Sequence, residues 1–92
     1  MNTLEKEITH RLQTLQPSKL TIYDDSAAHA GHSGALESGG GHFNILIVAE
    51  IFTSKTLIHR QRLVYKQLED LMPKRIHALS LKTLAPSEIW TN

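Results

Sequence analysis

The sequence contains no cysteine. The protein can therefore form no disulfide bond, carry out no thiol chemistry and offer no thiolate to a metal. A metal site that needs sulfur ligands has to obtain them from a partner molecule. The chain's six histidines can still offer imidazole nitrogens to a metal.

Long apolar runs and an excess of charge are also missing. No stretch approaches the roughly 20 apolar residues that a membrane span needs, so we expect no membrane association. The formal net charge is only +1, which is well short of the basic excess typical of nucleic-acid-binding proteins. Residues 1–9 lack the charged and then apolar regions of a secretory signal, so we expect a cytoplasmic protein.

The chain has 92 residues, of which 40% are hydrophobic, so we expect one domain over residues 1–92. Apolar residues at helical spacing predict two helices, over residues 3–15 and 56–72. In the second helix we expect a wide apolar arc to face the core. Its members are Leu57, Val64, Leu68 and Leu71, widened by Ile58, Tyr65 and Met72.

Three segments have the pattern of β-strands. Alternation over residues 20–23 predicts a half-buried strand, and the apolar run FNILIVA of residues 43–49 predicts a central one. Residues 76–83 alternate again, with His77, Leu79 and Leu81 on one face, which we expect to be the core face. Residues 86–90 suit a last helical turn that begins with a proline.

The order of these elements predicts an α/β (α+β) domain of the form αββαβα. The crossover through the second helix should leave the second and third strands parallel, while the first two pair antiparallel. The result is a three-stranded mixed sheet packed with helices. Residues 26–42 hold all five glycines and three histidines, His29, His32 and His42, so we expect a long mobile loop there with a binding role.

Three stretches resemble the BolA family. They are the acidic end of the first strand followed by Ser26, Ala27, Ala28 and His29; the run HFNILIVAEIF of residues 42–52; and RLVY together with IHALSLKTLAP, the latter spanning residues 76–86. The similarity covers nearly the whole chain. It implies a fold like the type II KH domain, in agreement with the predicted order of elements.

The resemblance also implies a function. Members of this family pair with monothiol glutaredoxins around a 2Fe-2S cluster, in cluster assembly, trafficking or iron regulation. The family's cluster histidine corresponds to His77, and its loop histidine corresponds best to His29, with His32 and His42 as alternates. A glutaredoxin cysteine and a bound glutathione would supply the remaining ligands, so the absence of cysteine is compatible with this function.

Each histidine also has a simpler interpretation. His77 alone could be a core-facing histidine that is merely hydrogen-bonded, and the loop histidines could bind metal only adventitiously. Catalysis is not expected, because Asp24, Asp25, Ser26 and His29 crowd together without a recognisable nucleophile and base arrangement.

A second function attributed to bacterial members of the family is DNA binding in transcriptional regulation. Lys55, His59, Arg62 and Lys66 recur at helical spacing and predict a basic stripe along the second helix. We include Arg60 in this candidate nucleic-acid or partner surface. Such a stripe is also what any solvated helix face looks like. The sequence departs from the family at Ser54, often glycine there, and at Arg60–Arg62, where Arg-His-Arg is common.

Overall fold

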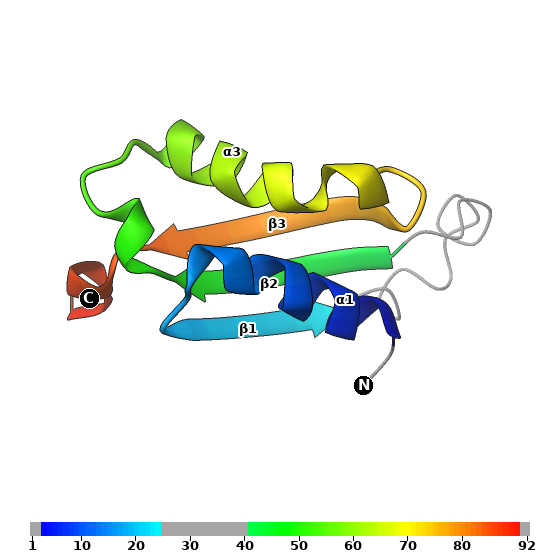
Figure 1. The fold of residues 1–92 in the computed structure, drawn as a ribbon, viewed down its shortest axis with the longest axis horizontal. Helices are drawn as coiled ribbons and strands as arrows, with labels where there is room; N and C mark the ends of the chain where they lie inside the picture. The colour runs from blue at the N-terminus through cyan, green and yellow to red at the C-terminus, as the bar shows by residue number, and fades with distance from the viewer. Residues whose placement is uncertain (1–2, 25–40, 91–92) are drawn as a thin grey trace.

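The computed structural model describes residues 3–24 and 41–90. The strands β1 (Lys19–Asp24), β2 (Gly41–Val48) and β3 (Ile76–Leu84) form one sheet in the order β1-β2-β3. β1 pairs antiparallel with β2, and β2 pairs parallel with β3 (Figure 1). The predicted three-stranded mixed sheet is confirmed, and β2 is central because it is the most apolar strand.

Two helices cover the sheet: α1 (Thr3–Leu12) precedes β1, and α3 (Leu57–Leu68) connects β2 to β3. α1 continues as a 3-10 turn, η1 (Gln13–Leu15), and α3 continues as η4 (Glu69–Leu71). Thr56 caps α3, because its Oγ1 accepts a hydrogen bond of 3.2 Å from the backbone N–H of His59. Short 3-10 segments follow β2 and β3, namely η3 (Glu50–Phe52) and η5 (Pro86–Trp90). The described order of elements confirms the predicted one.

The core lies between the sheet and the two helices, which pack on the same face of the sheet and contact each other (Figure 1). Alternate residues of β2 point into it, and α1 and α3 each supply residues one helical turn apart. The fully buried side chains include Ile8, Leu12, Ile47, Phe52, Val64, Leu68 and Ile76. The other face of the sheet carries the outward residues of the same strands, such as Thr21 and Tyr23, which are exposed.

The apolar arc predicted for the second helix is narrower than expected. Leu57 and Ile58 are 61% and 60% exposed, and Tyr65 is also exposed, so their assignment to the core was wrong. The sheet covers only the face of α3 centred on Val64. Leu57 and Ile58 lie in the first helical turn, and Ile58 and Tyr65 project about a third of a turn away from the covered face.

The predicted loop over residues 26–42 ends earlier than expected. Gly41 and His42 already belong to β2, and the backbone N–H of Gly41 donates a 3.1 Å hydrogen bond to the carbonyl of Arg75. The rest of the loop, with His29 and His32, lies outside the described residues. Within the described ranges, no helix is long and apolar enough to cross a membrane.

Candidate functional site

Two histidines meet where β2 and β3 begin. His42 is the second residue of β2 and His77 is the second residue of β3. Because the two strands are parallel neighbours, their first residues lie at the same edge of the sheet. The ring centroids of His42 and His77 are 5.3 Å apart and their planes are inclined by 48°. His77 is exposed and His42 is half-buried.

An irregularity in strand pairing sets the direction of His77. Gly41 pairs with Ile76 but His42 pairs with Ala78, so His77 is an extra residue on β3. Such a bulge changes which way the neighbouring side chains point. Ile76 is therefore buried, Leu79 packs against the core, and His77 is exposed. The expectation that His77 shares a core face with Leu79 and Leu81 was wrong for this reason.

The separation of the two imidazoles fits a shared metal. Imidazole nitrogens bind a tetrahedral metal at about 2.0–2.1 Å, so the centroids of two rings on one ion lie about 5 Å apart. The measured 5.3 Å between His42 and His77 matches this value. Among the described residues, no third His, Asp or Glu joins such a group. An iron held here would need further ligands from elsewhere.

The exposed cations of α3 form a second candidate surface. His59, Arg62 and Lys66 are exposed, and Lys55 is half-buried just before the helix. Residues 51–68 contain no aspartate or glutamate. We call these four residues, Lys55, His59, Arg62 and Lys66, the basic stripe. No acidic residue in this segment offsets its positive charge.

Arg60 does not belong to that surface, and its inclusion was wrong. The residue is only 9% exposed, and its guanidinium donates hydrogen bonds to the carbonyls of Lys55 (2.9 Å) and Thr83 (3.1 Å). It also makes a two-pronged ion pair with the Glu88 carboxylate, at 2.6 and 2.8 Å. We call Arg60 and Glu88 the clamp, because they join the start of α3 to β3 and η5.

The clamp changes the acidity of its carboxyl group. The hydrogen bonds from Arg60, followed by one from the backbone N–H of Ala85 (2.8 Å), lower the pKa of Glu88 to about 2. Sequence reasoning missed Glu88. Its signal was present: a proline that starts a helical turn, followed two residues later by a glutamate able to cap the backbone N–H of Ala85. Nothing in the sequence linked that glutamate to Arg60.

Comparison with known proteins identifies the family. The family model described as BolA-like protein matches residues 12–88. The chain belongs to the BolA-like family. The BolA domain of SufE1 from Arabidopsis thaliana superposes with a TM-score of 0.80 at 35% identity, covering 96% of this chain and 98% of that one. The predicted family and fold are therefore confirmed.

Two curated relatives show how varied BolA-like proteins are. SufE-like protein 1, chloroplastic/mitochondrial, of Arabidopsis thaliana is 39% identical over 90 residues, which is 94% of this chain but 22% of that protein. The DNA-binding transcriptional regulator BolA of Escherichia coli K12 is 30% identical over 86 residues, or 92% of this chain and 78% of that protein. The chain thus spans about a fifth of the length of the first relative.

Proposed function

We propose that this BolA-like chain is a non-catalytic adaptor that shares a 2Fe-2S cluster with a monothiol glutaredoxin and glutathione. The observation that carries the proposal is the pairing of His77 with His42 at a ring-centroid distance of 5.3 Å. Two imidazoles can replace two thiolates on one iron of such a cluster. The chain has no cysteine, so the glutaredoxin and glutathione would supply the sulfur ligands.

The two histidines would hold the iron as neutral imidazoles. The parallel pairing of β2 and β3 brings their backbones together, and the bulge at His77 turns that side chain outwards. The cluster would supply electron-accepting or iron-carrying capacity, and the chain's contribution is to bind and orient it. His42 is the second ligand that the geometry supports, whereas correspondence with the family favoured His29.

Reconstitution tests the adaptor function. The full chain, a monothiol glutaredoxin, glutathione, iron and sulfide are combined without oxygen, and visible absorption and circular dichroism are compared with glutaredoxin alone. We expect a distinct spectrum, which the His77→Ala variant loses or alters. A spectrum that His77→Ala leaves unchanged would rule out this ligand.

The second ligand is identified by the same measurement. We expect His42→Ala to change the spectrum as much as His77→Ala does, while His29→Ala and His32→Ala leave it close to that of the wild type. His10→Ala is the matched control, since His10 is an exposed histidine on α1. If His29→Ala alters the spectrum and His42→Ala does not, the assignment from the family is right and ours is wrong.

The second candidate function is DNA binding in transcriptional regulation. It is supported by the name of the Escherichia coli relative and by the basic stripe, which carries no acidic neighbour in residues 51–68. Changing Lys55, Arg62 and Lys66 to glutamine should abolish duplex binding, because the phosphate contacts are lost, while the cluster spectrum persists. Duplex binding that survives the triple change would exclude this surface.

We propose a cytoplasmic location for either function.

A further inference from the structure

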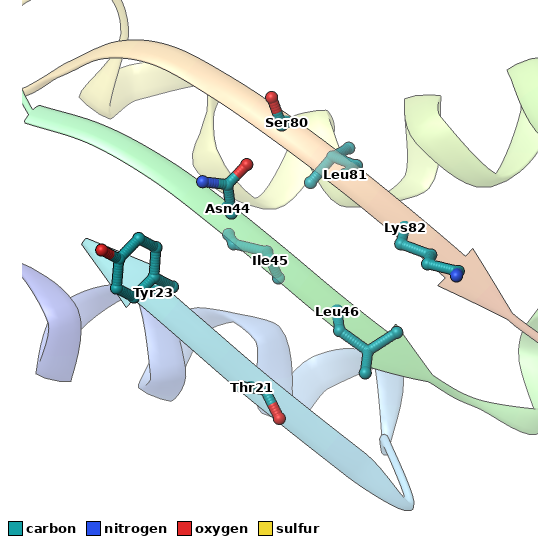
Figure 2. Close-up of a pocket in the computed structure, with 8 residues that line it drawn as sticks. All are labelled: Thr21, Tyr23, Asn44, Ile45, Leu46, Ser80, Leu81 and Lys82. Atoms are coloured by element: carbon teal, nitrogen blue, oxygen red, sulfur yellow. The ribbon is translucent and has the colours of Figure 1, made fainter. Parts of the chain in front are cut away.

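The face of the sheet opposite the helices contains a shallow hollow. It has a volume of about 280 Å³ and is lined by residues of all three strands (Figure 2). Strand register places these residues in two rows across the sheet, Tyr23–Asn44–Ser80 and Thr21–Leu46–Lys82. Ligand pockets usually measure about 300–1,000 Å³, so this hollow suits one flat group such as a nucleobase.

The lining combines an aromatic ring, apolar surface and amide and hydroxyl groups. Tyr23 is 61% exposed, although it lies on a strand, and Leu46 lies half-buried on β2 in the neighbouring row, opposite Thr21. Figure 2 shows Tyr23 and Lys82 on the two outer strands, with Asn44 and Leu46 on the strand between them. An exposed aromatic on an open sheet is the kind of surface on which unpaired bases stack.

The charge of this face has one sign. Among the outward-facing residues of the described strands, the ionised ones are Lys19 and Lys82, and both are exposed. Asp24, the one acidic residue of the strands, alternates with Tyr23 and so falls on the helix side. The face is therefore complementary to an anionic ligand.

We propose that the open face binds single-stranded nucleic acid, with one base stacked on Tyr23 and a phosphate beside Lys82. Neighbouring strands are about 4.8 Å apart, so the two outer strands lie about 10 Å apart. Tyr23 and Lys82 are also offset by one row, since Tyr23 aligns with Asn44 and Lys82 with Leu46. A base on Tyr23 and a phosphate at Lys82 therefore belong to neighbouring nucleotides, which favours an oligonucleotide over a mononucleotide.

Single-stranded nucleic acid fits better than a duplex, because paired bases are stacked on each other and present no open face to Tyr23. The surface also differs from the basic stripe, which lies on the helix side of the molecule. The proposal does not rest on the cluster function. His42 lies two residues before Asn44 on β2, so the histidine pair borders the proposed site without contributing to it.

Fluorescence anisotropy with a labelled ten-nucleotide oligothymidylate tests the proposal on the full chain at low salt. We expect Tyr23→Ala to weaken binding about tenfold, as loss of one stacked base does. Lys82→Gln should weaken binding less. It should also make the plot of log affinity against log salt concentration less steep by about 0.7, the value for one phosphate contact on a single strand. Tyr23→Phe, which keeps a ring for stacking, should bind like the wild type.

The chain offers matched controls on its other side. Tyr65→Ala removes a ring from an exposed position of α3, and Lys6→Gln removes a positive charge from an exposed position of α1 outside the basic stripe, so both should leave the affinity unchanged. In the ¹⁵N-labelled chain, the oligonucleotide should shift the amide signals of Thr21, Asn44 and Leu46. All substituted positions are exposed, so circular dichroism should show every variant folded.

Three results would overturn the proposal. The first is absence of binding, and the second is loss of binding in Tyr65→Ala or Lys6→Gln but not in Tyr23→Ala or Lys82→Gln. The third is self-association of the chain that Tyr23→Ala abolishes, since a second copy would then occupy the face. Loss of the cluster spectrum in His77→Ala has no bearing on these outcomes, so the two proposals fail separately.

Discussion

The two ends of β3 differ in how their polar groups are satisfied. At the end of the strand, the guanidinium of Arg60 donates hydrogen bonds to the carbonyls of Lys55 and Thr83 and forms the clamp with the Glu88 carboxylate. At its start, six residues or about 20 Å away, His77 projects beside His42 and is exposed. A charge that is hydrogen-bonded within its own chain stabilises the fold, whereas two adjacent imidazoles, of which that of His77 is exposed, are groups that a metal ion could bind.

Removing the clamp should have the largest effect. Arg60→Met keeps the aliphatic part of the side chain but removes the donor to the carbonyls of Lys55 and Thr83 and the ion-pair partner of the Glu88 carboxylate. We expect the free energy of unfolding to fall by about 2 kcal/mol, measured by urea denaturation. Arg62→Met, the exposed neighbour, is the control and should change it little. Equal stability of the two variants would show that the clamp has no structural role.

The histidine end should be sensitive to its glycine. A Cβ at Gly41 would collide with the ring of the buried Phe43, so Gly41→Ala requires that ring or the strand to move. We expect the free energy of unfolding, measured by urea denaturation, to fall by about 1 kcal/mol, together with a weaker cluster spectrum. Adding Phe43→Leu should recover part of the stability. A Gly41→Ala variant as stable as the wild type would contradict this prediction, because it would show that the Phe43 ring or β2 moves without cost.

Acid should weaken the clamp in a defined range. The folded pKa of Glu88 is about 2, lowered from an ordinary value of 4.5, so its stabilising effect is present above about pH 4.5 and lost as the pH falls towards 2. The wild type should therefore have a higher melting temperature than the Glu88→Gln variant at neutral pH. The difference between the two should shrink as the pH falls from about 4.5 to 2. A difference that stays constant down to pH 2 would contradict the lowered pKa.

The smallest expected effect concerns the turn before α3. Ser54 has a φ of 64°, in the left-handed region that favours glycine. Ser54→Gly should raise the free energy of unfolding by about 1 kcal/mol or less, because relief of backbone strain is partly offset by a more flexible unfolded chain. Thr53→Gly, next to it, should lower stability instead.

Local patterns in the sequence were enough to predict the helices and strands, since the helices and the two outer strands have a clear period and β2 is an almost continuous apolar run. They were also enough to predict the topology, because a strand–helix–strand crossover has a strongly preferred handedness. For the site, the resemblance named His77, and composition placed His42 in a group of three candidates. The direction of His77 depends on a bulge, which the alternation of residues 76–83 did not reveal.

Sequence alone therefore determined which segments are helix and strand, that the chain has no thiolate to offer, and which residue types could bind a metal. Only the tertiary structure decided which of those residues meet. Arg60 looks like any exposed cation in a helical pattern, and its burial depends on Glu88, 28 residues away. His42 and His77 become neighbours only through strand pairing, because contacts between distant residues are set by packing and register rather than by local periodicity.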